Sequence, residues 1–381
     1  MVSTRKNRKS GDEISLLGFG GMRFPLLPGT EEIDERQVAE MVELAIQNGV
    51  NYFDTAFPYH GGKSEVVLGR VLNDHPRDRY FLADKLPLWE LKTPQDVDDM
   101  FELQLKKCGK AHFDYYLMHS LCVPTWDAAK RTDAYRVLER KKREGKIRNL
   151  GFSFHDRLPL LKEIVRACDW DFAQLQINYV DWVAIGAKEM YQCLADAGIP
   201  VAVMEPLRGG ALVNLPKQAA EELERATPHA TPASWGLRFA ASLPNVMTVL
   251  SGMSSTEQVA ENVRNLSDFA PLSSEENAML DRIRILYQSA STIPCTGCRY
   301  CMPCPRGVNI PGNFTAYNIY RGSGNVNWVF LNAYFGLLTE QEFSSNCVSC
   351  GLCEKKCPQH IRIPHELKKV RMTAEKLKDG W

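Results

Sequence analysis

Residues 347–358 read CVSCGLCEKKCP, which places three cysteines at steps of three residues and a fourth directly before a proline. This C-x2-C-x2-C-x3-C-P spacing is one by which bacterial proteins hold 4Fe-4S clusters. A second run, CTGCRYCMPCP at 295–305, has one residue fewer before its last cysteine. Because 304–311, CPRGVNIP, also reads like 357–364, CPQHIRIP, the two runs belong to an internal repeat. The repeat predicts a unit with pseudo-twofold symmetry.

Eight cysteines in two runs predict two clusters, each with four thiolate ligands. In two-cluster ferredoxins, the Cys-Pro cysteine of each run ligates the cluster of the other run. Zinc and disulfides are the alternatives, but three cysteines followed by Cys-Pro are not typical of four-ligand zinc sites. The expected ligand sets are Cys295, Cys298, Cys301 with Cys357, and Cys347, Cys350, Cys353 with Cys304, while Cys108, Cys122, Cys168 and Cys193 are expected to be ordinary thiols.

The composition is that of a folded chain and lacks the features of nucleic-acid-binding, membrane-spanning and secreted proteins. Its 381 residues are 44% hydrophobic and 24% charged, which allows a large core. The 46 basic residues equal the 46 acidic ones, so no nucleic-acid-binding footprint is present. No apolar run could span a bilayer. The basic cluster Arg5–Lys9 precedes polar residues instead of an apolar signal segment. We expect this cluster to be a solvated end. We expect a cytoplasmic protein, where reducing conditions disfavour disulfides.

Upstream of the cysteines, short apolar runs alternate with longer amphipathic stretches, as in a parallel sheet with crossover helices. Two helices are readable, 34–48 and 94–107. Eight strands at this spacing predict an α/β fold, a (β/α)8 TIM barrel over 1–288, followed by a ferredoxin-like two-cluster domain over 289–381. A doubly wound sheet is less favoured, since Gly18–Gly21 lacks the third glycine of G-x-G-x-x-G. The expected strands are 16–20, 52–55, 81–85, 115–119, 150–153, 172–176, 201–205 and 246–251.

Polar residues at the carboxyl ends of barrel strands are candidates for chemistry. Asp54, Lys85 and His119 come at the ends of the second, third and fourth expected strands, and Tyr59 follows Asp54 in the loop on the same face. With FDTAFPY at 53–59 and SEVVLG at 64–69, these residues resemble the catalytic tetrad of the aldo-keto reductase family and its surroundings. Together with the C-terminal cysteines, the chain resembles the iron-sulfur-containing branch of that family.

The chemistry of the four residues agrees with what the resemblance implies. Reduction of a carbonyl by hydride requires a proton for the developing alkoxide, and a tyrosine with an unperturbed pKa of about 10 is a weak acid. A buried ammonium at Lys85 would favour the ionised phenol of Tyr59, and Asp54 would keep Lys85 charged. His119 would orient the carbonyl or share the proton. Taken singly, these residues could instead be a buried ion pair, a core histidine and a loop aromatic.

The resemblance also implies a nicotinamide cofactor, either NAD or NADP. Gly252 and Gln258 stand where NADP-preferring relatives often carry basic residues, so the choice between the two is open. Arg264 or Arg208 could supply the charge that a 2′-phosphate needs. The implied contacts are Ser153 and Gln174 at the carboxamide, Pro206, Leu207, Arg208 and Gly210 at the pyrophosphate, and Ser251, Gly252, Ser254, Gln258, Glu261 and Asn262 along the pyrophosphate and adenosine.

Three functions are compatible with this pairing of domains. In the first, the barrel reduces a small carbonyl compound or oxidises an alcohol, and the clusters are structural or sense oxidation. In the second, the clusters exchange electrons with an external ferredoxin, although the sequence has no flavin fingerprint to couple one-electron clusters to two-electron hydride transfer. In the third, the barrel senses nicotinamide without catalysis, and the complete tetrad argues against this. The loop residues Leu88, Trp89, Leu121 and Trp126 could line an apolar substrate pocket.

Overall fold

The structure is a computed structural model that describes residues 1–227, 230–290, 293–323 and 325–378. Contacts divide the chain into two compact units. The first comprises Met1–Pro206 and Gly236–Leu272, and the second comprises Leu207–Trp235 and Ser273–Trp381. None of the described helices is long and apolar enough to cross a membrane.

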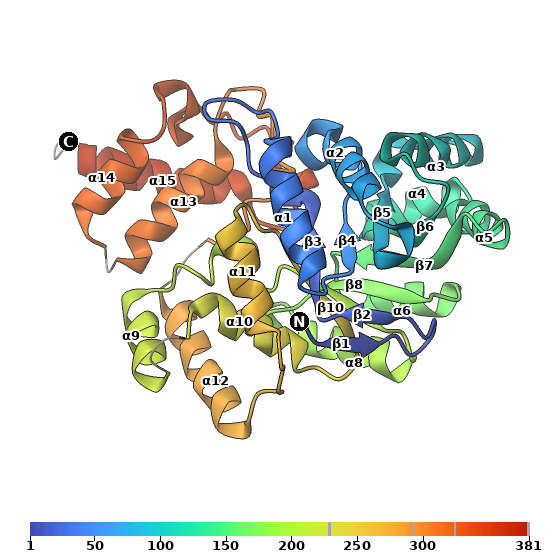
Figure 1. Cartoon of the computed structure of the whole chain (residues 1–381). Coiled ribbons are helices and arrows are strands. Elements are labelled where there is room, and N and C mark those ends of the chain that lie inside the picture. The colour runs from blue at the N-terminus through green and yellow to red at the C-terminus, as the bar shows by residue number, and fades with distance from the viewer. Residues whose placement is uncertain (228–229, 291–292, 324, 379–381) are drawn as a thin grey trace. The chain divides into compact units, whose positions relative to one another are not determined.

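The first unit contains a closed barrel of parallel strands, hydrogen-bonded in the order β10-β3-β4-β5-β6-β7-β8-β9 (Figure 1). Every strand lies where the apolar runs predicted it, so the (β/α)8 fold is confirmed. Strands β6 and β7 extend beyond the expected range at both ends. The bounds are β3 Leu17–Gly20, β4 Tyr52–Asp54, β5 Phe81–Leu86, β6 Phe113–Leu121, β7 Ile147–Phe154, β8 Phe172–Gln176, β9 Val201–Met204 and β10 Val246–Ser251.

An antiparallel hairpin of β1, Thr4–Lys6, and β2, Glu13–Ser15, precedes the barrel and was not predicted. Of the basic cluster, Lys6, Arg8 and Lys9 are exposed, as expected of a solvated end, whereas Arg5 is not. Arg5 is partly buried and donates to the carbonyl oxygens of Ala241 at 2.9 Å, Leu243 at 2.9 Å and Val246 at 2.5 Å. The carbonyls at the end of a helix need donors from elsewhere, and a guanidinium offers several in a fixed plane. The sequence pattern alone does not reveal such a partner.

The helices around the barrel begin and end at recognisable capping residues. The Asp34 carboxylate accepts the backbone N–H of Gln37 at 3.0 Å and starts α1. In α3, the side chains of Thr93 and Asp96 accept each other's backbone N–H, and Gly109 ends the helix with a φ of 61°. Both helices start where the sequence predicted. The bounds are α1 Glu35–Gln47, α2 Ser64–Val71, α3 Pro94–Cys108, α4 Val123–Arg131, α5 Ala134–Arg143, α6 Leu158–Ala167, α7 Asp181–Ala184, α8 Ala187–Asp196, α10 Pro232–Ala241 and α11 Thr256–Asn265.

Aromatic side chains fill the barrel interior near the amino ends of its strands. The Tyr115 ring centroid lies 5.1 Å from that of Tyr52 and 5.0 Å from that of Phe172. All three residues are fully buried. This packing closes the amino end, so the polar side chains at the carboxyl ends of the strands are the ones available for binding and chemistry.

The second unit has a core of its own, in which α13, α14 and α15 pack together (Figure 1). Tyr334 stacks on Phe330 and Phe343, with ring centroids 5.1 Å and 4.7 Å away. Partly buried cysteines of both runs pack against this core. The helices are α9 Lys217–Ala226, α12 Ser274–Ser289, α13 Ile310–Gly322, α14 Asn327–Phe335 and α15 Ile363–Leu377.

The backbone of the two cysteine runs follows the internal repeat. In each run, left-handed φ angles occur at the second and fourth residues after the first cysteine, and again three residues after the Cys-Pro cysteine. In each run the sulfur of the first cysteine accepts a backbone N–H from two residues on, at 3.4 Å. Each run then leads into a helix with a proline in its first turn, α13 or α15. The left-handed residues are Gly297, Arg299 and Gly307 in the first run and Ser349, Gly351 and His360 in the second.

Candidate active site

Four polar side chains meet at the carboxyl ends of neighbouring barrel strands. Asp54 is the last residue of β4, Lys85 lies near the end of β5, and His119 lies near the end of β6. Tyr59 opens the short 3-10 turn η2, Tyr59–Gly62, in the loop after β4. Asp54, Lys85 and His119 are buried, whereas Tyr59 is half-buried. The barrel thus brings together the four residues that the sequence singled out.

The Lys85 ammonium has three donors and three partners. It donates to Asp54 Oδ1 at 2.5 Å, to the Thr55 carbonyl oxygen at 2.7 Å and to the Tyr59 hydroxyl oxygen at 3.3 Å. Gln174 donates to the second Asp54 oxygen at 3.2 Å. The arrangement places the ammonium beside the phenol oxygen, where a positive charge would stabilise a phenolate.

Burial sets the protonation states around this ammonium. It raises the pKa of Asp54, an effect that Lys85 and Gln174 oppose. It lowers the pKa of His119 well below the usual range, and the charges of Lys85 and His155 add to the shift. His119 is therefore a neutral imidazole at neutral pH, with one donor and one acceptor nitrogen. Its ring lies edge-on to the Tyr59 ring, with 6.2 Å between the centroids.

The loop that presents Tyr59 has an uncommon backbone. His60, Gly61 and Gly62 have consecutive left-handed φ angles of 51°, 62° and 88°. Such a φ is costly for a residue other than glycine unless its surroundings compensate. Here His60 Nε2 accepts the backbone N–H of Phe24 at 3.1 Å, and the two rings stack with centroids 5.7 Å apart. The sequence analysis missed His60; the adjacent glycine pair was the signal of a tight turn there.

Trp89 covers His119 from the loop after β5. The two ring centroids are 5.1 Å apart, and 44% of Trp89 is exposed. Leu88, Leu121 and Trp126, which we had also considered as pocket residues, are buried. Of these four apolar side chains, Trp89 is therefore the one available to a substrate.

The two carboxamide candidates lie on neighbouring strands. Ser153, in β7, accepts the backbone N–H of Ser120 with its hydroxyl oxygen at 2.7 Å. Gln174, in β8, is paired with it in register and donates to Asp54. Both side chains are buried beside the tetrad.

The end of β10, the loop after it and the helix α11 hold the cofactor candidates from Ser251 to Asn262. The Asn262 amide donates to the Ser251 hydroxyl at 3.1 Å. The Gln258 side-chain oxygen accepts the backbone N–H of Ser254 at 2.8 Å. Glu261 lies on the same helix and is half-buried. The start of α11 adds the positive end of a helix dipole, a feature that favours phosphate.

Arg23 is a cation at this loop that the sequence analysis missed. The Ser254 hydroxyl donates to the Arg23 carbonyl oxygen at 2.8 Å. A methyl group at Gly252 would lie 3.2 Å from Arg23 Cδ. The residue follows the Gly20-Gly21-Met22 turn after β3, and nothing in the local pattern distinguishes it from a surface arginine.

The turn after β9 packs inside the second unit. Arg208 is 6% exposed, and its guanidinium carbon lies 5.8 Å from the centroid of the Tyr287 ring. Gly209 has a φ of 65°, and a methyl group there would lie 1.8 Å from the carbonyl oxygen of Thr296. Only glycine fits this approach. The turn is thus packed against the first cysteine run, and the cofactor contacts expected from Pro206, Leu207, Arg208 and Gly210 stay predictions.

The first cysteine run borders a cavity together with one cysteine of the second run. Cys295, Cys298 and Cys301 lie on it with Cys357, the crossed set that the repeat predicted. Burial raises the pKa of the Cys301 thiol to about 12, and the other three cysteines contribute. Four crowded thiols of this kind ionise when a cationic metal centre binds among them. The donor set fits a 4Fe-4S cluster, and apolar walls are supplied by Ile310, Pro311, Phe314, Ile361 and Ile363.

The second run has the same turn but is more open. Cys350 is exposed, as are 58% of Val348 and 51% of Leu352. Among the described residues, no three Cys, His, Asp or Glu side chains converge on a site for a single ion. The residues that would hold a second cluster are Cys347, Cys350 and Cys353, with Cys304 from the first run.

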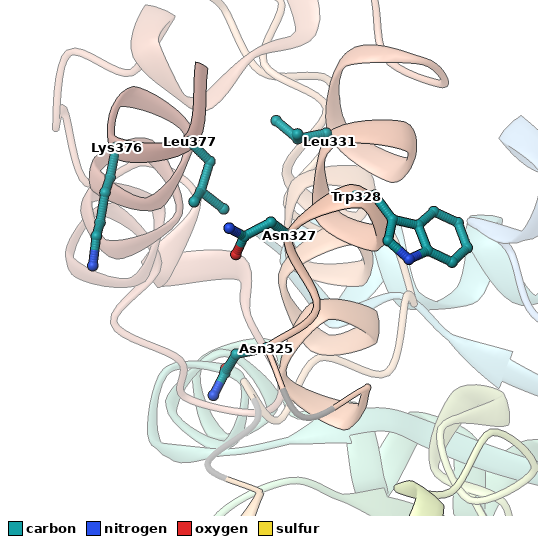
Figure 2. Close-up of a pocket in the computed structure, with 6 residues that line it drawn as sticks. All are labelled: Asn325, Asn327, Trp328, Leu331, Lys376 and Leu377. Carbon is teal, nitrogen blue, oxygen red and sulfur yellow. The ribbon is translucent and has the colours of Figure 1, made fainter. Parts of the chain in front are cut away.

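A separate cavity of about 660 Å³ lies beside α14 in the second unit (Figure 2). In Figure 2, Trp328 and Asn327 project from different sides of the helix. Among the described residues, the lining contains no carboxylate, imidazole or thiol, so we assign no chemistry to it. Its residues are Asn325, Asn327, Trp328, Leu331, Lys376 and Leu377.

The model of the aldo/keto reductase family matches residues 16–285, which include the whole tetrad. The chain belongs to the aldo/keto reductase family. This aldo/keto reductase is accordingly an NAD(P)-dependent oxidoreductase, as the tetrad indicated. A model of the 4Fe-4S dicluster domain matches residues 294–361. Both parts of the family resemblance are confirmed.

The reductase is similar to curated proteins over its barrel. It is 26% identical over 303 residues to the NADH-specific methylglyoxal reductase of Escherichia coli, covering 67% of this chain and 92% of that protein. It is 24% identical over 311 residues to the L-galactose dehydrogenase of Arabidopsis thaliana, covering 75% and 94%.

Solved structures share the fold of the reductase. The holo form of an aldo-keto reductase from Bacillus halodurans has a TM-score of 0.63 and 23% identity, covering 74% of this chain and 96% of that one. An aldo-keto reductase from Klebsiella pneumoniae in complex with NADPH has a TM-score of 0.61 and 21% identity, covering 74% and 95%.

Proposed function

We propose that this aldo/keto reductase reduces a small carbonyl compound with NADH or NADPH, or oxidises the corresponding alcohol in the reverse direction. The observation that carries the proposal is the contact of Lys85 Nζ with both the Asp54 carboxylate and the Tyr59 hydroxyl in one buried site. The family acts on small-molecule carbonyl compounds. Methylglyoxal, named for the Escherichia coli relative, is the first compound to test.

The tetrad residues have separate tasks in this reaction. Nicotinamide, when bound, supplies or accepts the hydride. Tyr59 donates its proton to the carbonyl oxygen as negative charge develops there. Lys85 stabilises the phenolate, and Asp54 holds the ammonium in place. His119 orients the carbonyl as a neutral hydrogen-bonding group, and Trp89 offers an apolar surface beside it.

We assign the cofactor contacts to the residues expected from the sequence, with Arg23 added. Ser153 and Gln174 would hold the carboxamide. The loop between β10 and α11 would hold the phosphates at the start of a helix. Because Gly252 and Gln258 carry no charge, Arg23 is the nearest described candidate to that loop for recognising a 2′-phosphate.

We also propose two 4Fe-4S clusters in a C-terminal domain that begins at residue 289. The crossed set around Cys357 is supported by the cavity that these cysteines border. A cluster, when bound, exchanges single electrons. The cytoplasmic location expected from the sequence stays a prediction.

A second candidate function is electron exchange with an external one-electron carrier such as a ferredoxin. The exposure of Cys350, between the exposed side chains of Val348 and Leu352, favours it. Solvent-exposed apolar side chains beside a redox ligand are suited to the small, transient interfaces of electron-transfer partners.

The decisive experiment compares wild type with Tyr59→Phe, both purified anaerobically. We expect wild type to oxidise NADH or NADPH in the presence of methylglyoxal or another small aldehyde. The variant keeps the ring and its packing but has no proton to give, so turnover should fall by about 10²-fold to 10⁴-fold. Cofactor binding, measured by fluorescence titration, should not change. Wild-type turnover in Tyr59→Phe would remove Tyr59 from the role of proton donor.

A further inference from the structure

A second polar network lies behind the catalytic pair, between β5 and the helices α2 and α3. The Gln104 amide nitrogen donates to the carbonyl oxygen of Lys85 at 3.0 Å and to Glu65 Oε1 at 2.7 Å. The amide oxygen accepts the Tyr116 hydroxyl at 2.5 Å. Glu65, Gln104 and Tyr116 are fully buried. Every hydrogen-bonding group of this amide is thus engaged, which fixes it against the main chain of Lys85.

Asp84 supports the same residue from the other backbone group. Its carboxyl oxygen accepts the backbone N–H of Lys85 at 2.8 Å. Burial and the neighbouring Glu65 carboxyl raise the pKa of Asp84 well above the usual range. Both backbone polar groups of Lys85 therefore bond to side chains that meet at Glu65.

The network reaches the Tyr59 loop through Lys107. Glu65 Oε2 forms an ion pair with Lys107, whose Nζ lies 4.8 Å from the centroid of the Phe57 ring. A methyl group at Gly62 would lie 3.5 Å from the same Nζ. Phe57 and Gly62 stand on either side of Tyr59 in the chain, so the ammonium lies close to the loop both before and after the proposed proton donor.

We propose that Lys107 and Glu65 are positioning residues that hold the Tyr59 loop in register with Lys85. The proposal rests on the roles proposed above for Tyr59 and Lys85. One end of the network bonds the main chain of Lys85, and the other end holds the loop whose own backbone is left-handed at three successive residues. The two side chains that it aligns are 3.3 Å apart at Nζ and the hydroxyl oxygen. A misplacement of about 1 Å at such a contact lowers rates by as much as about a hundredfold.

The test replaces Lys107 by methionine and uses its exposed neighbour as the matched control. In Lys107→Met we expect kcat to fall by about tenfold while KM and cofactor affinity stay unchanged. The alkaline limb of the dependence of kcat on pH should move, because the Lys85 ammonium would no longer lie in register with the Tyr59 hydroxyl. Amide hydrogen exchange over 56–63 should become faster. Lys107→Arg should restore all three readouts, and Lys106→Met should match wild type.

Each outcome decides the proposal. Wild-type kcat and wild-type exchange in Lys107→Met overturn it, as do equal losses in Lys106→Met. Phe57→Leu removes the ring next to the Lys107 ammonium but keeps the ion pair of Lys107 with Glu65. Smaller changes in kcat and in hydrogen exchange than those of Lys107→Met, in the same direction, support the proposal. Unchanged hydrogen exchange counts against the proposal. If wild type itself turns over no carbonyl compound, the proposed function fails, and hydrogen exchange alone then decides whether Lys107 holds the loop.

Discussion

The tetrad and the first cysteine cavity are built in opposite ways. The tetrad takes single residues from three strands and a loop, and the barrel around it has an aromatic core at its other end. The cysteines come from two short turns, and the cavity that they border is walled by the first residues of α13 and α15. A barrel that packs without its catalytic residues should survive their loss. The cysteine turns that border the cavity should not keep their conformation once a ligand of the group they hold is lost.

Lys85→Met should produce the largest effect of any change in the barrel. It is also the exception to the contrast, because losing this catalytic residue should lower stability as well as activity. Catalysis should fall by about 10²-fold to 10⁴-fold. Because Asp54 then loses its cation in a buried site, the free energy of unfolding should also fall, by up to about 3–5 kcal/mol. Urea denaturation of Lys85→Met beside Tyr59→Phe separates the two effects. Equal stability in both variants would mean that Asp54 takes up a proton at little cost.

Cys357→Ala should remove one cluster and leave the other. Anaerobically purified wild type should contain about eight irons per chain, and the variant about four. If the ligand sets are crossed, the iron content of double variants with Cys357→Ala depends on which second cysteine is replaced. Adding Cys298→Ala should remove no further iron, whereas adding Cys350→Ala should remove the rest. The reverse pattern would contradict the crossed sets, and Cys193→Ala on α8 serves as the control.

Gln258→Arg should shift cofactor preference by a smaller amount. A guanidinium at the start of α11 would form a charge-assisted contact with a 2′-phosphate, so NADPH should bind about tenfold more tightly relative to NADH. The dissociation constants of both cofactors measure this ratio. Arg23→Ala should move the ratio the opposite way, and an unchanged ratio in both variants would place 2′-phosphate recognition elsewhere.

The titration of His119 should have the smallest effect, a loss of stability at acid pH. Its pKa in the folded chain lies well below the unfolded value of about 6.5, so the unfolded chain binds a proton first as pH falls. Stability is therefore lost below about pH 6.5, with a slope of about 1.4 kcal/mol per pH unit from this group. His119→Gln should remove this contribution. The unfolding free energy should then fall less steeply between about pH 6.5 and 5, by about 1.4 kcal/mol per pH unit. An unchanged slope would mean that His119 already carries its proton in the folded chain.

Much of this architecture could be predicted because its signals are local. The eight strands are short apolar runs, and the capping residues Asp34 and Thr93 mark helix starts in the sequence itself. The meeting of Asp54, Lys85 and His119 could be expected because strand ends in a barrel share one face, whereas the tetrad itself came from the family resemblance and its roles stay predictions. The crossed cysteine set followed from spacing and repeat.

The features that were missed depend on contacts between distant segments. Arg5 bonds carbonyls more than two hundred residues away, and Arg23, which follows β3, lies beside Gly252, which follows the neighbouring strand β10. The burial of Arg208 against Tyr287 likewise required the packed structure. No local pattern encodes such partners, because in the sequence each of these three arginines looks like an ordinary surface residue.

The matched left-handed residues of the two cysteine runs have a consequence for charge. Alternation of right-handed and left-handed residues turns successive peptide N–H groups toward one side, forming a nest for an anion. The N–H groups of Gly297 and Ser349, each directed at a cysteine sulfur, are the visible part of it. A cluster with four thiolates is such an anion, and its reduction adds more negative charge. The backbone of these turns would thus help to set how readily each site accepts an electron, together with Arg299, which borders the first cavity.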